Sequence, residues 1–243
     1  PLPGVATQWE ISADGLRYIF HLRPDARWSN GEALTAHDFV YSWRRALDPE
    51  TASENSYMLY ALKNGQAFNE KEAAPEDVGV RALDERTLEV TLEKPTAYFL
   101  SLASFHAFYP VHRASIEKAP ESWSSQAETL IGNGPFRLTG WVHHGSLSFA
   151  KNPYYRDAAS IRLVGMYWPI VDAQATRLTL VETGQADMMV EPPVVEHDRL
   201  QKEGLLRIAP YLGLYYYVFN TQAPPFDRVE VRRSFALSFQ RQA

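Results

Sequence analysis

The sequence has no cysteine among its 243 residues. Disulfide bonds, thiol catalysis and cysteine-ligated metal sites are therefore excluded within this chain. The cellular compartment stays open, because disulfides concentrate in small secreted domains, and a chain of this length can build a core without them.

Long apolar runs and long basic runs are missing as well. No apolar stretch approaches the ~20 residues that a membrane-spanning helix needs, and no signal-peptide pattern is visible. The formal net charge is −5, so the sequence predicts no nucleic-acid partner. The chain starts at Pro1 without Met and ends inside a predicted helix. We therefore expect a fragment of a longer protein, for which a missing signal is uninformative.

The patterns of several enzyme classes are also absent. The sequence contains neither the Gly-x-Ser-x-Gly nucleophile elbow nor the Walker phosphate loop, and we predict no catalytic residue, cofactor or metal. His143 and His144 are adjacent, so on a strand they would point to opposite faces and could not share a metal. Asp and Glu number 29, and a paired-carboxylate glycan hydrolase stays an alternative because sequence alone does not place two of them together.

The composition that is present is typical of a folded domain. Hydrophobic residues make up 45% and charged residues 22%, close to globular averages, which argues against overall disorder. The chain carries 13 Tyr, 12 Phe and 6 Trp. Aromatic residues in such number can fill a core and can also line a pocket for ligands of mixed polarity.

The first part of the chain alternates hairpins and helices. Apolar residues at every second position of 16–22, after an Asp14-Gly15 turn, predict a half-buried strand of a hairpin. A helix is expected to begin after Thr35, with Asp38 completing an approximate capping box, and to end at 48–49. A second hairpin is predicted over 78–92, and a short aromatic helix after Pro95.

The later part shows the same mixture. Strands are predicted at 136–138, 147–149 and 161–167, followed by a helix over 173–183 that Gly184 terminates. A further strand pair is predicted at 205–208 and 214–220, and a last helix from 229. Frequent hairpins among alternating strands and helices indicate a mixed α/β fold rather than a purely parallel sheet.

Five stretches, in order along nearly the whole chain, resemble the family-5 extracellular solute-binding proteins, which include the oligopeptide and dipeptide receptors of ABC importers. They are Tyr18 to Asp48-Pro49 with Trp28-Ser29-Asn30-Gly31 inside it, Asn133-Gly134-Pro135-Phe136 with Trp141, Lys151-Asn152-Pro153-Tyr154-Tyr155, Gly184-Gln185-Ala186-Asp187, and Tyr215 to Asn220 with Pro224-Pro225-Phe226 and Val231-Arg232-Arg233. The Thr35 to Trp43 form, followed by 48–53, is most similar to the oligopeptide-binding branch.

The resemblance implies a periplasmic-binding-protein type II (Venus flytrap) architecture, with an additional α+β domain on the first lobe and the second lobe largely missing. On this basis residues 1–110 are expected to form the additional domain and residues 111–209 a first-lobe segment. Residues 210–243 would supply the strand that crosses the hinge and the start of the second lobe. With one wall of the cleft missing, these 243 residues are expected to bind peptide weakly or not at all.

The resemblance also implies a function and a set of ligand contacts. The protein is expected to capture oligopeptides at the periplasmic or extracellular face of the cytoplasmic membrane, lipid-anchored if Gram-positive, and to pass them to an ABC permease. Tyr211 and Tyr216 match the aromatic contacts of the crossing strand, with Glu191 near the cleft. Where oligopeptide receptors often carry Tyr, this chain has Glu54-Asn55, with Tyr57 two residues later; Asn55 and Tyr57 complete the predicted contacts.

Each of these residues has a structural alternative. Tyr211 and Tyr216 could be hinge aromatics with satisfied hydroxyls, and Glu191 a solvated loop carboxylate. Trp28 and Trp43 are predicted to be core or loop anchors. For the whole protein, the alternatives are a receptor for another solute such as an oligosaccharide or a metal chelate, a secreted glycan hydrolase, and a sensory or adhesive module that kept the fold.

Overall fold

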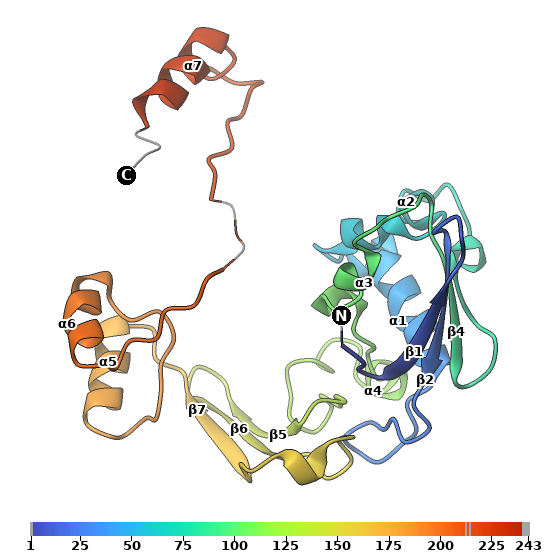
Figure 1. The fold of residues 1–243 in the computed structure, drawn as a ribbon, viewed down its shortest axis with the longest axis horizontal. Helices are drawn as coiled ribbons and strands as arrows, with labels where there is room; N and C mark the ends of the chain where they lie inside the picture. Colours follow the sequence, from blue (N-terminus) through green and yellow to red (C-terminus); the bar gives the residue numbers. More distant parts are fainter. Residues whose placement is uncertain (1, 212, 214, 240–243) are drawn as a thin grey trace. The chain divides into compact units, whose positions relative to one another are not determined.

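The computed structural model describes residues 2–211, 213 and 215–239. Internal contacts divide the chain into two compact units, Pro1–Asp172 and Ala173–Ala243, which are described separately (Figure 1).

The first unit contains seven strands and four α-helices among the described residues. The strands are β1 Ala6–Ile11, β2 Arg17–Leu22, β3 Val80–Ala82, β4 Thr87–Thr91, β5 Phe136–Val142, β6 Ser146–Lys151 and β7 Gly165–Pro169. The α-helices are α1 Ala36–Leu47, α2 Gly65–Asn69, α3 Phe99–Leu102 and α4 Arg113–Lys118, and the 3-10 turns are η1 Pro49–Thr51, η2 Ser56–Ala61, η3 Pro75–Asp77, η4 His106–Phe108 and η5 Ala158–Ser160.

An antiparallel sheet of order β1-β2-β4-β3 forms the base of the first unit. Tyr18 on β2 lies opposite Val90 on β4, and Phe20 lies opposite Leu88. All four side chains are buried in one core, which α1 and α3 cover (Figure 1). The alternation in the sequence therefore predicted both hairpins and the face that they bury.

Helix α1 begins where the sequence predicted. The Thr35 backbone N–H donates to Asp38 Oδ2 at 2.7 Å, and the Thr35 hydroxyl lies 3.0 Å from the same oxygen. Trp43 and Leu47 on its inner face are buried in the core. The Trp43 indole N–H donates to the Phe108 carbonyl at 2.9 Å, so this buried donor has a partner.

The outer face of this sheet carries one buried carboxylate. Glu89 on β4 is 8% exposed and accepts hydrogen bonds from Arg17 on β2 and Arg81 on β3. Burial alone would raise the pKa of Glu89, but hydrogen bonds and charge from the two arginines outweigh it, and the pKa is lowered. Glu89 is therefore an ionised link across three strands.

The second sheet, of order β5-β6-β7, is antiparallel throughout. A register shift between Leu138 and Gly140 interrupts the β5–β6 ladder. The two adjacent histidines lie in the connecting loop: His144 has a positive φ of 61°, and the His143 ring stacks on Trp141 with centroids 4.8 Å apart. β7 starts at Gly165, later than the predicted strand.

Three of the sequence motifs meet in the first unit. The Ser29 N–H donates to the Gly132 carbonyl at 2.7 Å, which joins the turn after Trp28 to the strand that begins at residue 136. Asn152 is fully buried, and its side-chain amide donates to the Gly134 carbonyl at 2.8 Å. The Ser29–Gly132 hydrogen bond therefore joins segments that are more than 100 residues apart in sequence, and the Asn152 amide fixes the second of these segments locally.

A second set of contacts reinforces this junction. Gly31 has a φ of +92°. A Cβ on this residue would lie only 3.0 Å from the nearest atom of the Tyr154 ring. His112 is buried, its ring lies edge-on to Trp28, and its Nε2 lies 2.7 Å from a Glu32 carboxylate oxygen. The hydrogen bond with His112 lowers the pKa of Glu32. The motif around Trp28 is thus a structural clamp.

The second unit contains α5 Gln174–Glu182, η6 Val194–Glu196, α6 His197–Lys202 and α7 Val229–Ser238. Leu178 on α5 and Leu200 on α6 are its buried core residues. Arg199 pairs with Glu182, Glu196 and Glu203 across the two helices. Gly184 has a φ of +70° and follows α5 directly, as predicted for a C-terminal stop.

The strand pair predicted for the second unit is wrong. Residues 205–211, 213 and 215–220 form no strand, while position 214 lies outside the described residues. Their side chains are largely exposed, from 60% for Tyr217 to 91% for Tyr211 among the tyrosines. A strand needs a neighbouring backbone to pair with, and the described residues of this unit supply none here.

Candidate functional site

The first unit contains an open pocket of about 600 Å³. It lies between the start of the chain, the core face of the first sheet, α1 and the segment after α3. Its lining is Leu2, Gly4, Val5, Ala6, Trp9, Phe20, Leu22, Phe39, Trp43, Leu88, Leu100, Ser101, Ala103, Ser104, Phe108, Tyr109, Pro110, Asn133 and Arg156.

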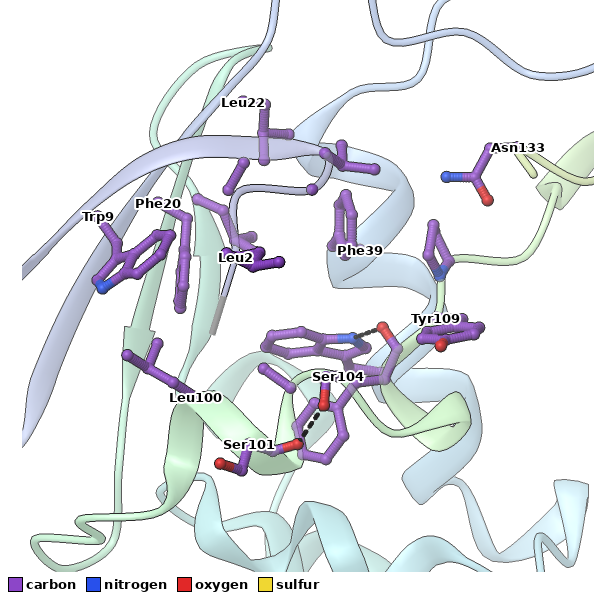
Figure 2. A pocket seen from close by; sticks show the side chains of 18 of the residues that line it. Leu2, Trp9, Phe20, Leu22, Phe39, Leu100, Ser101, Ser104, Tyr109 and Asn133 are labelled. Carbon is purple, nitrogen blue, oxygen red and sulfur yellow. Dashed lines mark hydrogen bonds between the residues drawn. The ribbon is translucent and has the colours of Figure 1, made fainter. Parts of the chain in front are cut away.

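The polarity of this pocket changes from one side to the other. Figure 2 shows Trp9, Phe20 and Leu100 at one side, and Tyr109 and Asn133 at the other. The lining also includes Arg156, whose side chain is 26% exposed. The pocket can therefore take a molecule with an apolar body and a polar end.

Two polar groups of the pocket are already engaged. The Trp43 indole N–H donates to the Phe108 carbonyl, and the Ser104 hydroxyl donates to the Ser101 carbonyl at 2.7 Å (Figure 2). These two groups are satisfied within the protein and are not available to a ligand.

The tyrosine-rich segment of the second unit is the other candidate surface. Tyr211 is 91% exposed and Tyr216 is 69% exposed within the residues that the structure describes. The rings of Tyr215 and Tyr217 lie 6.0 Å apart in an edge-to-face arrangement, and Tyr217 contacts Phe235 on α7. Tyrosines of this exposure present both ring and hydroxyl to a ligand or to another segment of protein.

The remaining predicted contacts lie in a loop, before η2 and on η2, and Asn55 is half-buried while the other two are exposed. Glu191 has a positive φ of 54° and an exposed side chain. Asn55 precedes η2, and its amide nitrogen lies 3.4 Å from His106 Nε2. Tyr57 on η2 is 57% exposed. None of the predicted ligand contacts lines the pocket of the first unit.

The predicted residues are divided between the two units. Asn55 and Tyr57 belong to the first, and Glu191, Tyr211 and Tyr216 to the second. No pattern in the sequence marks the pocket, because Phe39 and Trp43 have the helical spacing of ordinary core residues. The aromatic content was the one available signal, and it did not indicate a position.

The described residues contain neither a metal site nor a membrane-spanning helix. Within them, no three His, Cys, Asp or Glu side chains are grouped so that they could hold a metal ion. None of the helices over residues 2–211, 213 and 215–239 has the length and apolar character to cross a membrane.

The mixed α/β fold and the motif junction are those of a solute-binding protein of the bacterial extracellular type. The family model of bacterial extracellular solute-binding proteins, family 5 Middle, matches residues 1–243. The chain belongs to this family. Its members are binding proteins rather than enzymes, and they include periplasmic proteins.

The chain is similar to individual binding proteins of this family. The chain is 36% identical to the oligopeptide-binding protein OppA of Bacillus subtilis, with 100% of this chain and 45% of that protein aligned. It is 40% identical to the probable deoxycholate-binding periplasmic protein YgiS of Escherichia coli, over 99% of this chain and 45% of that protein. The chain thus spans about half the length of the curated relatives that it matches.

The fold is shared with a solved structure. The murein tripeptide binding protein MppA of Escherichia coli superposes with a TM-score of 0.91 at 34% identity, covering 99% of this chain and 47% of that one. The chain therefore has the mixed α/β fold of a type II periplasmic binding protein of family 5, over part of that fold.

Proposed function

We propose that the protein captures oligopeptides outside the cytoplasmic membrane and delivers them to an ABC permease. The observation that carries the proposal is the family match over residues 1–243, together with relatives named oligopeptide- and dipeptide-binding proteins. A receptor of this kind binds the peptide main chain by backbone pairing and leaves room for varied side chains. It carries out no chemistry on its ligand, and its place is the periplasm or the outer face of the membrane.

The proposed architecture places residues 1–110 in the additional domain, residues 111–209 in the first lobe, and residues 210–243 at the hinge and the start of the second lobe. Peptide capture would close the lobes, because contacts made only in the closed state shift the population toward it. The junction that joins residues 28–32 to residues 112–154 supports a rigid attachment of the additional domain to the first lobe.

Tyr211 and Tyr216 are the proposed aromatic contacts, with Glu191, Asn55 and Tyr57 as further candidates. The exposure of both tyrosines supports this role, since an exposed ring is available to a ligand. Tyr215 is equally suitable in chemistry and is 90% exposed, but the resemblance does not assign it to the ligand. It is therefore a matched control.

The test is thermal stabilisation of the full-length protein by a diverse peptide library, with oligosaccharides and metal chelates as parallel arms. Peptides should raise the midpoint of unfolding, because a ligand that binds only the folded state stabilises it. Tyr216→Ala should reduce the shift while Tyr215→Ala leaves it. No shift with any peptide would overturn the proposal, and a shift with a sugar or chelate would assign the protein to another solute.

A second candidate solute is a bile-acid-like molecule. The observation that favours it is the 40% identity to the probable deoxycholate-binding protein, which exceeds the 36% identity to the Bacillus subtilis oligopeptide-binding protein. Deoxycholate in the same thermal screen separates the two candidates. Stabilisation by deoxycholate that Tyr216→Ala reduces, with no stabilisation by any peptide, would favour this second candidate, because Tyr216 does not line the pocket of the first unit.

A further inference from the structure

The pocket of the first unit lies apart from every residue that the proposed function uses. Its lining comes from the start of the chain, β1, β2, α1, β4, the segment 100–110, Asn133 and Arg156, all within the first unit. The proposed peptide contacts Asn55 and Tyr57 in that unit do not line it. Its volume of about 600 Å³ lies inside the range of about 300–1,000 Å³ that is typical of small-molecule sites.

The walls define the body of a ligand. Phe20, Leu22 and Leu88 belong to the buried core and reach the pocket from the sheet. Trp9 and Phe39 are partly buried and face it from β1 and α1 (Figure 2). A ligand body that covers these side chains gains most free energy if it is itself apolar, because it then removes apolar surface on both molecules from water.

The polar side defines the other end of the ligand. Arg156 also lines the pocket. Its Nε donates to Asp157 at 2.9 Å, and its guanidinium carbon lies 5.0 Å from the centre of the Tyr155 ring. Its two terminal nitrogens have no hydrogen-bond partner among the residues that the structure describes. The Asn133 amide lies half-buried on this side (Figure 2). A guanidinium with two available nitrogens favours a planar anion such as a carboxylate.

We infer that this pocket is a second ligand site, which takes an amphipathic carboxylate with a compact or linear apolar body. The body lies against Trp9, Phe20 and Phe39, and the carboxylate lies beside Arg156 and Asn133. Both a sterol acid and a medium-chain fatty acid share this chemistry. The site is independent of the peptide site and goes beyond the proposed function.

The test uses isothermal titration calorimetry of the purified protein with deoxycholate and with decanoate, each below its critical micelle concentration. Saturable binding with one site is expected for at least one of the two probes, and which of them binds distinguishes a compact from a linear body. Decanol should bind at least ~10-fold more weakly than decanoate, because it lacks the charge that Arg156 recognises.

Two matched pairs of variants locate the site. Ala6→Phe fills the pocket from β1, while Thr7→Phe adds the same ring at an exposed neighbour that does not line it. Arg156→Gln removes the cation, while Arg162→Gln removes an exposed arginine outside the pocket. Ala6→Phe and Arg156→Gln should each weaken probe binding ~10-fold or more, and the two controls should leave it unchanged.

Ala103→Phe fills the pocket from the end of α3 and replaces Ala6→Phe if that variant does not fold, as judged by circular dichroism. Absence of saturable binding of both probes would overturn the inference, as would binding that neither filling variant weakens. Peptide-induced stabilisation is measured separately on the same variants and should persist in all of them. Failure of the peptide proposal and failure of this one are therefore distinguishable.

Discussion

At the scale of single residues, one glycine is required by a close approach as well as by its backbone. Gly31 combines a φ of +92° with the Tyr154 ring 3.0 Å from the position of a Cβ. Gly15 in the same unit has a φ of +69°, but its Cβ would meet only Pro95 at an ordinary 3.6 Å. The two positions therefore separate the effect of the backbone from the effect of the clash.

We expect Gly31→Ala to lower the free energy of unfolding by about 1–2 kcal/mol more than Gly15→Ala does. Both variants carry the strain of a positive φ, and only the first must also displace a ring from the junction. Urea unfolding followed by tryptophan fluorescence measures the difference. Equal losses in the two variants would mean that the Tyr154 ring moves aside freely.

Glu89 sets a pH dependence at the same scale. Its pKa is lowered in the folded protein from the ordinary value of 4.5, so the carboxylate stabilises the fold at pH above 4.5. That contribution is lost as pH falls through the folded-state pKa. Glu32, whose pKa is lowered by the hydrogen bond with His112, acts in the same direction.

Glu89→Gln should lower stability at pH 7 by about 1–2 kcal/mol, because Arg17 and Arg81 lose their charged partner while remaining largely exposed. It should also reduce the loss of stability between pH 5 and pH 3, which chemical denaturation at several pH values measures. Part of the loss of stability at low pH should remain in the variant, because Glu32 also becomes protonated there. An unchanged pH profile would show that Glu89 is not ionised through this network.

At the scale of elements, α1 depends on a local cap and on distant packing. Asp38 accepts a hydrogen bond from the Thr35 N–H at 2.7 Å, which satisfies one of the free donors at the start of the helix. Trp43 and Leu47 bury the opposite end of the same helix face in the core. The cap fixes where the helix begins, and the core fixes where it lies.

Asp38→Ala should therefore destabilise the first unit by about 1 kcal/mol, with the fold retained. His37→Ala is the matched control, since His37 is exposed in the same helical turn. Thermal unfolding by circular dichroism compares the two. Equal midpoints for the two variants would show that the cap adds nothing to the stability that packing provides.

The segment 207–219 behaves as an element without a partner. Its described residues donate no backbone hydrogen bond, and most of its side chains are exposed. Limited trypsin digestion of the 243-residue chain should cut after Arg207 before it cuts at arginines of the first sheet, because cleavage needs a backbone that is free of pairing. Mass spectrometry of the first fragments identifies the site, and early cleavage at Arg17 or Arg81 would contradict this order.

At the scale of the whole molecule, the 243 residues span about 45% of the length of their relatives. We expect these residues by themselves to bind peptides far more weakly than the full-length protein, because contacts that close a cleft come from both of its walls. Calorimetry with the same peptide on the two proteins measures the ratio. Micromolar peptide binding by the 243 residues would contradict the expectation.

The sequence by itself determined the two hairpins of the first sheet, the start of α1 and the family. Each rests on neighbouring residues: alternation selects the buried face of a strand, and Thr35 with Asp38 marks a helix start. The same local rules predicted strands at 205–208 and 214–220, which the described residues do not form. Residues with high β-propensity favour an extended backbone, but a strand forms only when another backbone is available to pair with it.

Only the tertiary structure decided how distant residues combine. Ser29, Glu32 and Asn152 became parts of one junction because their partners lie elsewhere in the chain. The pocket likewise gathers residues from Leu2 to Arg156, and none of them carries a local mark of that role. Periodicity reports which side of an element is buried, but the partner against which it is buried depends on packing between segments far apart in sequence.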